Sequence, residues 1–265
     1  MIGLPRRGRK VVPQRTPGEL DAMAAAGAVV GAALVAVREA TKPGVSTLEL
    51  DGVAEAVIRD AGAVPSFKGY HGFPGSICSS VNDVVVHGIP SAEVVIADGD
   101  LVSIDCGAIL DGWHGDSSRM FAVGEISPQA KRLIEVTHAS MMAGIEAVKP
   151  GATLGDIGYA CQQVAENAGY SVVQEFCGHG IGRGFHEEPQ VLHYGRKGQG
   201  MELKPGMIFT VEPMINQGKR HLRILADGWT VVTKDRSLSA QWEHEVLVTD
   251  TGYEILTISP ASGQP

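Results

Sequence analysis

Two aspartates, Asp105 and Asp116, flank a sequence typical of a β-hairpin and could together bind a cation. The apolar segment 101–123 is interrupted by Leu110-Asp111-Gly112, and Asp-Gly between two apolar runs favours a tight turn. Folding the chain there places Asp116 opposite Asp105 or on its diagonal, and either register leaves both on one face. Two buried carboxylates repel each other unless they are protonated or bridged by a cation, so the pair indicates a metal site.

Histidines and glutamates elsewhere in the chain offer further ligands. His179 and His186 lie in the glycine-rich segment 178–186, where glycine permits positive φ and close approach of the backbone to a tight site. Glu243 and Glu245 stand two residues apart at the start of an apolar run, so they would share one face of a strand. Each of these residues alone is equally typical of a structural histidine or a solvated strand glutamate.

Other catalytic motifs are broken or absent. His186-Glu187-Glu188-Pro189-Gln190 begins like the helical zinc motif H-E-x-x-H, but it ends on glutamine and its proline would break the helix. The chain contains no G-x-x-x-x-G-K-[ST] phosphate loop and no G-x-S-x-G nucleophile elbow. Covalent catalysis therefore has no support from sequence motifs.

An internal repeat indicates which elements position these residues. Lys42-Pro43-Gly44 recurs as Lys149-Pro150-Gly151, an offset of 107 residues. Each copy follows an apolar-periodic stretch, 22–40 or 130–148, and opens a second amphipathic stretch that closes on Ala-Gly. This pattern predicts helix, turn and helix in each half, with glycine as the C-terminal stop.

The same offset aligns two later segments, 98–105 and 205–212, each a turn followed by an apolar run that ends in an acid. Asp105 and Glu212 are equivalent positions in this alignment. We therefore expect two halves related by a pseudo-twofold axis, with Asp105 and Glu212 facing each other at the ends of buried strands. A symmetry-related pair of buried acids again favours a shared metal ion.

Composition limits the class of protein. The chain has 265 residues, of which 44% are hydrophobic, which is enough for a full core. Its net charge of −8 does not favour specific binding to nucleic acid. The cysteines have no C-x-x-C spacing, which predicts reduced thiols in a cytoplasmic protein.

The N-terminal region shares one pattern with secretory signals, a basic arm (residues 1–15) followed by an uncharged stretch (22–37). Acidic Glu19 and Asp21 precede the stretch, however, and it is shorter than the ~20 residues of a membrane span. Thr16-Pro17-Gly18-Glu19 has the residues of a helix start. We expect a basic arm, then an alanine-rich helix packed closely on a sheet, and no contact with a membrane.

On these residues the chain resembles the pita-bread metallopeptidases. The densest matches are SIDCGAILDGWHGDSSRMF, CGHGIGRGFHEEPQVLHY, GMIFTVEPM and DGWTVVTKDRSLSAQWEHEVLVT, and GYHGFPGSICSSVNDVVVHGIP resembles the bacterial type I methionine aminopeptidases in particular. The resemblance implies an α+β pita-bread fold, with a curved antiparallel sheet and outer helices in two pseudo-twofold-related halves. It also implies a single catalytic domain over residues 16–262, with halves at about 16–123 and 124–262.

The resemblance further implies two divalent metal ions, Mn²⁺, Fe²⁺ or Co²⁺ with Zn²⁺ as an alternative, which suit an oxygen-rich ligand set. The implied ligands are Asp105, Asp116, His179, Glu212 and Glu243. Asp116 and Glu243 would be shared between the ions, which lower the pKa of an attacking water, and Glu212 would manage its proton. His186 would hydrogen-bond the substrate carbonyl, and His87 would contact the scissile amide nitrogen.

Substrate selection, by the same resemblance, depends on a pocket for an unbranched thioether. The implied lining residues are Phe67, Tyr70, Phe73, Cys78, His87, Phe185 and Trp229. An aromatic and sulfur-containing slot suits the flexible, polarisable methionine side chain. Phe73 stands where the family commonly has tyrosine, which keeps the ring and removes a hydroxyl.

The expected function is removal of the initiator methionine from nascent proteins whose second residue is small, by a monomer. The expected partners are the N-terminal methionine of nascent peptides and, for the basic arm, the ribosome surface. One alternative is an Xaa-Pro aminopeptidase or prolidase-like hydrolase, which usually carries an N-terminal domain for which residues 1–15 leave no room. The other is a non-catalytic binding protein on the same fold, which typically loses ligands that this chain keeps.

Overall fold

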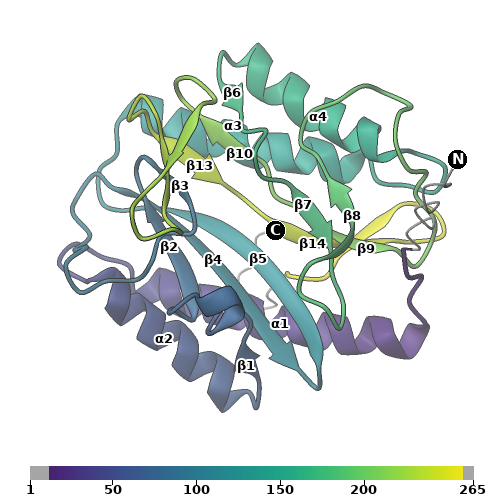
Figure 1. Ribbon diagram of the computed structural model, residues 1–265, viewed down its shortest axis with the longest axis horizontal. Helices are drawn as coiled ribbons and strands as arrows, with labels where there is room; N and C mark the ends of the chain where they lie inside the picture. The colour runs from purple at the N-terminus through teal and green to yellow at the C-terminus, as the bar shows by residue number, and fades with distance from the viewer. Residues whose placement is uncertain (1–11, 259–265) are drawn as a thin grey trace, which may run out of the picture.

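The computed structural model describes residues 12–258, in which two pairs of helices lie on opposite sides of a group of antiparallel strands (Figure 1). The helices are α1 (Pro17–Ala40), α2 (Thr47–Asp60), α3 (Pro128–Glu146), α4 (Leu154–Asn167) and the short 3-10 helix η1 (Tyr70–Gly72). The basic residues Arg6, Arg7, Arg9 and Lys10 of the expected arm lie outside the described residues, as do residues 259–262 of the expected domain.

The strands of the first half are β1 (Val64–Pro65), β2 (Ile77–Val81), β3 (Val84–Val86), β4 (Leu101–Leu110) and β5 (Trp113–Ala122). Those of the second half are β6 (Ser171–Val172), β7 (Gly178–Gly180), β8 (Glu187–Val191), β9 (Ile208–Val211), β10 (Met214–Asn216), β11 (Leu222–Ile224), β12 (Val231–Thr233), β13 (Ser239–Gln241), β14 (His244–Val248) and β15 (Tyr253–Ile255). One sheet has the order β1-β4-β2 with β5 paired to β4, and another has β15-β14-β9-β7-β8. Two smaller sheets, β13-β10-β6 and β11-β12-β3, lie beside them.

Helix α1 begins as its sequence predicts. Thr16 is the N-cap, Pro17 occupies the first turn, and the Glu19 carboxylate accepts the Thr16 backbone N–H at 2.8 Å. The helix packs on β4 and β5 so closely that a Cβ on Gly115 would lie 2.7 Å from the backbone of Ala26. Among the described helices α1 alone has the length and apolar composition of a membrane span, but its buried face belongs to the protein core.

The repeat of 107 residues is confirmed in the structure. Helices α2 and α4 both begin and end at that offset. Their N-caps are equivalent, since the Glu49 carboxylate accepts the Ser46 N–H at 2.8 Å and the Asp156 carboxylate accepts the Thr153 N–H at 2.7 Å. Strands β1 and β6 have the same offset, and so do the first residues of β4 and β9. The fold is thus the predicted pair of related halves.

One positional prediction is wrong. Asp105 lies in the middle of β4, which continues to Leu110, and not at the end of a strand. The hairpin with β5 extends the ladder beyond the acid, whereas β9 stops at Val211, immediately before Glu212. Pro213 follows and has no N–H to continue the ladder. Asp105 therefore lies within a paired strand, whereas the equivalent Glu212 lies just beyond the end of one.

Candidate metal centre

The β4–β5 hairpin brings the two aspartates to one face. Asp105 pairs with Ser118 and Asp116 pairs with Gly107, so the acids lie on a diagonal of the ladder. The turn is at Asp111 and Gly112, both with positive φ, as the Asp-Gly sequence predicts. Of the two registers that the sequence allowed, the structure has the diagonal one.

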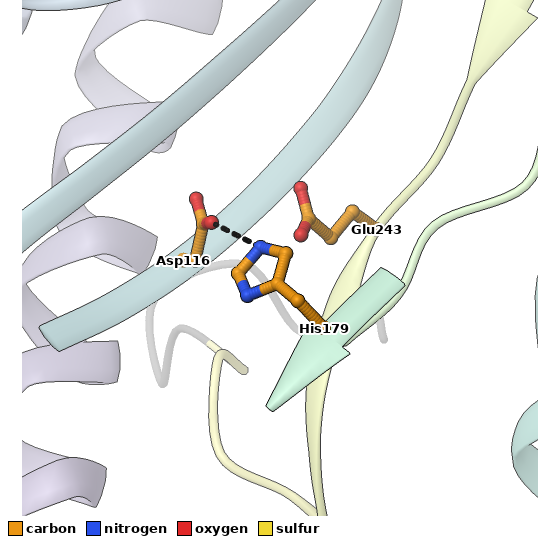
Figure 2. A group of neighbouring side chains, drawn as sticks. All are labelled: Asp116, His179 and Glu243. Carbon is orange, nitrogen blue, oxygen red and sulfur yellow. Dashed lines mark ion pairs between the residues drawn. The ribbon is translucent and has the colours of Figure 1, made fainter. Parts of the chain in front are cut away.

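The second half supplies an imidazole and two more carboxylates. His179 lies in β7, Glu212 follows β9, and Glu243 precedes β14. Figure 2 shows Asp116, His179 and Glu243 pointing toward one another, and each offers a ligand atom within 4.8 Å of the others. His179 Nε2 is 3.6 Å from Asp116 Oδ2 and 3.7 Å from Glu212 Oε1. Asp105 lines the same cavity, so all five predicted ligands are brought together.

The glycines around His179 serve one of the two purposes that the sequence indicated. None of the glycines at 178, 180, 182 and 184 has positive φ, so that part of the prediction is wrong. The close approach is present, because a Cβ on Gly178 would lie 3.1 Å from Thr210 Oγ1 and one on Gly180 would lie 3.0 Å from Pro189 N. Strand β7 sits between β8 and β9, and this crowding explains the need for glycine.

Burial shifts the pKa values of the carboxyl groups of the site toward the neutral form. Burial, followed by the charge of Asp116, raises the pKa of Asp105 well above its ordinary value. Burial also raises the pKa of Asp116 and, together with the neighbouring acids, that of Glu243. Burial raises the pKa of Glu212 to about 8, although the nearby His179 opposes this.

The donor set fits divalent cations. Oδ1 of Asp105 and Oδ1 of Asp116 are buried without a hydrogen-bond partner within the described residues. Buried anionic oxygens are stabilised by a cation, and four carboxylates with one imidazole are a hard set of ligands. His179 Nδ1 lies 3.0 Å from the Gly180 carbonyl oxygen, and donation to that oxygen leaves Nε2 free as a ligand.

Three residues that support Glu212 were missed by the sequence analysis. Its Oε1 accepts the Thr210 hydroxyl at 2.7 Å, and its Oε2 lies 3.4 Å from Gln241 Nε2. The Glu212 backbone N–H donates to Nε2 of buried His193 at 2.9 Å. Nothing in the sequence near His193 marks it, because the contact joins segments 19 residues apart through the fold.

A cavity of about 300 Å³ connects the ligands to an aromatic recess. All of the predicted pocket residues line it: Phe67, Tyr70, Phe73, Cys78, His87, Phe185 and Trp229. It is also lined by residues that the sequence analysis did not name: Val86, Glu175, Phe176, Cys177, Met214 and Gln241. The rings pack edge to face, with centroids 5.2 Å apart for Phe73 and Trp229, which gives the recess rigid walls.

Two neutral histidines face this cavity. His186 Nδ1 is 2.8 Å from the Tyr70 hydroxyl, and its ring stacks on the Tyr70 ring. Burial, followed by the charge of His179, lowers the pKa of His186 to about 3. Burial also lowers the pKa of His87, whose ring meets Phe176 edge to face. Both imidazoles can therefore act at neutral pH as uncharged hydrogen-bond donors.

The raised carboxyl pKa values predict that the metal-free protein loses stability as pH rises. The pKa of Glu212 is 4.5 ordinarily and about 8 in the folded chain, so the folded state binds this proton more tightly than the unfolded state does. The resulting contribution to folding stability is complete below about pH 4.5 and is lost as the pH rises through about 8. Thermal denaturation of chelator-treated protein should give a Tm that falls over this interval. Added divalent cation should raise the Tm most at the alkaline end.

The matched control for this prediction is Glu212→Gln, which keeps the shape and removes the titrating group. Its metal-free Tm should depend less steeply on pH than that of the unmodified chain. Equal slopes in the two proteins would show that Glu212 does not titrate as its burial predicts.

Comparison with known proteins agrees with the geometry. Residues 21–250 match the model of metallopeptidase family M24. Methionine aminopeptidase 1 of Mycobacterium tuberculosis (strain CDC 1551 / Oshkosh) is 52% identical over 258 residues, covering 95% of this chain and 97% of that protein. Methionine aminopeptidase of Escherichia coli (strain K12) is 51% identical over 245 residues, covering 92% and 93%. The structure of methionine aminopeptidase from Rickettsia prowazekii matches with a TM-score of 0.92 at 49% identity, covering 94% of this chain and 100% of that one.

Proposed function

This chain belongs to metallopeptidase family M24, and we infer from its 52% identity to methionine aminopeptidase 1 of Mycobacterium tuberculosis that it is the hydrolase that removes N-terminal methionine from polypeptides. The observation that supports this inference is a cavity in which four carboxylates and His179 adjoin an aromatic recess containing Cys78. A recess of this kind suits a thioether side chain, and a methionine bound there would have its peptide bond beside the proposed ligands.

We propose that two divalent ions bind Asp105, Asp116, His179, Glu212 and Glu243. When bound, such ions supply an activated water and Lewis acidity toward the scissile carbonyl. The hard ligand set favours Mn²⁺, Fe²⁺ or Co²⁺, with Zn²⁺ as the alternative.

The residues around the ligands have distinct proposed roles. Glu212 is the candidate acceptor for the proton of the attacking water, and its contacts to Thr210 and Gln241 hold both carboxylate oxygens. His186 donates from Nε2 to the substrate carbonyl when the Tyr70 hydroxyl donates to Nδ1. His87 contacts the amide nitrogen that becomes the leaving amine. The aromatic recess excludes water and fixes the methionine side chain.

We further propose a cytoplasmic monomer with one catalytic domain over residues 16–262, with halves at about 16–123 and 124–262. The free thiols of Cys78, Cys106, Cys161 and Cys177 support the cytoplasmic assignment. The basic residues of the N-terminal arm make the ribosome surface a candidate partner through its anionic RNA.

Release of free methionine from Met-Ala-Ser, beside Met-Ile-Ser and an Ala-Pro peptide, tests the proposed function. Each peptide is incubated with Mn²⁺, Co²⁺, Fe²⁺ or a chelator. We expect metal-dependent cleavage of Met-Ala-Ser alone, because the specificity we propose requires methionine followed by a small residue. Cleavage of Ala-Pro alone would assign the chain to a prolyl peptidase activity. A metal-loaded protein that cleaves none of the peptides would support the non-catalytic binding protein.

A further inference from the structure

Arg15 links the segment before α1 to the loop that carries two residues of the proposed site. Its backbone N–H donates to the Gly206 carbonyl at 2.8 Å, which fixes the segment against the second half of the molecule (Figure 1). The side chain is only 10% exposed. One guanidinium nitrogen donates to the Ile181 carbonyl at 3.2 Å and to Glu187 Oε2 at 2.5 Å. Arg15 therefore contacts both ends of the loop 181–187.

Two further hydrogen bonds close the loop, and one of them is accepted by the same glutamate. Glu187 Oε1 accepts the Gly184 N–H at 2.8 Å, while Gly182 N–H donates to the Gly184 carbonyl at 3.1 Å. A Cβ on Gly182 would overlap the guanidinium of Arg15, so the arginine packs directly on the loop backbone. Charge-assisted bonds of this kind are short and strong, and here they are partly buried.

The loop presents Phe185 and His186 to the cavity. The Phe185 ring lies 5.2 Å from Phe67 and 5.1 Å from Tyr70, so it forms one wall of the recess. His186 follows directly and is bonded to the Tyr70 hydroxyl. A shift of the loop would therefore move the methionine recess and a proposed hydrogen-bond donor together, and small misplacements of such groups slow catalysis.

We propose that Arg15, which lies more than 160 residues away in sequence, is a positioning residue for Phe185 and His186 and acts through Glu187. The inference rests on the proposed function of the cavity. Arg15 does not line the cavity, so its effect on turnover is indirect. The guanidinium of Arg15 also lies over the Trp113 ring, 5.3 Å from its centroid, and this cation–π contact helps to hold the arginine side chain in place.

The test compares Arg15→Ala, Arg15→Lys and Glu187→Gln with Arg132→Ala. Arg132 is the matched control, because it also donates to a backbone carbonyl, that of Ala168, and lies on the exposed surface. For each variant, kcat and KM on Met-Ala-Ser, bound metal, Tm, and hydrogen exchange of the backbone amides would be measured.

We expect Arg15→Ala to lower kcat/KM by about 10- to 100-fold with unchanged metal content. Exchange should accelerate at the amides of Gly182 and Gly184 and not in β9. Arg15→Lys should recover part of the loss, since it keeps the charge next to Glu187. Arg15→Ala combined with Glu187→Gln should be no worse than Arg15→Ala, because the two residues act as a unit.

Wild-type kcat/KM and loop exchange in Arg15→Ala would overturn the proposal. So would faster exchange throughout the chain together with a lower Tm, because that result describes general destabilisation. An equal loss in Arg132→Ala would also overturn it. If the unmodified chain releases no methionine, the proposed function is wrong, but that result does not test the role of Arg15. Hydrogen exchange in the loop 181–187 still shows whether Arg15 holds the loop in place.

Discussion

Asp116→Asn and Glu243→Gln will each lower methionine release about a thousandfold or more, a loss that corresponds to roughly 4 kcal/mol of transition-state stabilisation. Both carboxylates are buried at the centre of the cavity, and each offers a ligand atom to the cluster in Figure 2. If both ions share these two carboxylates, as the family resemblance implies, the loss of either carboxylate would disturb the ligand sets of both ions.

The same variants will remain folded. Burial raises the pKa of both carboxyl groups, and neighbouring acids raise that of Glu243 further, so a neutral amide at either position removes a charge that the metal-free site disfavours. The metal-free Tm should therefore be equal to or higher than that of the unmodified protein, while the gain in Tm on adding Mn²⁺ is lost. Calorimetry with and without metal, together with metal analysis, measures both effects.

Glu245→Gln is the control for position. Glu245 lies two residues after Glu243 and is fully buried, but it does not line the cavity. Its amide variant should bind metal and release methionine within about threefold of the unmodified chain, which is a small change in free energy. Unchanged turnover in Asp116→Asn or Glu243→Gln would refute the ligand assignment.

His186→Ala will lower kcat about 100- to 1000-fold, the range measured when a donor to a developing oxyanion is removed. His186 is not a proposed ligand, so metal content should stay the same. Tyr70→Phe removes only the hydroxyl bonded to His186 Nδ1 and should have a smaller effect in the same direction. Exposed His221 provides the control, and His221→Ala should leave kcat unchanged.

Steady-state kinetics on Met-Ala-Ser separate an effect of His186 on substrate binding from an effect on the catalytic step. A change confined to KM would mean that His186 stabilises the bound substrate and the transition state equally. A loss of bound metal in His186→Ala would contradict the division between ligands and hydrogen-bond donors that we propose.

Local chemistry made much of the fold predictable. The Asp111-Gly112 turn determined the hairpin, and the repeated Lys-Pro-Gly at 42–44 and 149–151 marked the starts of two equivalent helices. The repeat then related Asp105 to Glu212, which no short motif connects. Patterns of this kind are readable because turn and cap residues act within a few positions of the chain.

The parts that were missed depend on contacts between distant segments. Thr210, Gln241 and His193 surround Glu212, but their role is visible only when β9, β13 and the loop after β8 are assembled. The glycines near His179 were expected to allow both positive φ and close approach of the backbone, and only the close approach, to neighbouring strands, is present. Sequence periodicity describes one element at a time and does not report such crowding.

The two halves meet at the metal centre itself, and this has a consequence for how the protein acquires its activity. The Ser117 hydroxyl donates to the Glu243 carbonyl at 2.6 Å across a sequence separation of 126 residues, and the Glu243 N–H donates to Ser118. Contacts between such distant parts of a chain form late and slowly during folding. Because the proposed ligands are divided between the two halves, the complete metal site forms only when both halves have folded and met, and full metal loading reports that the whole molecule has folded.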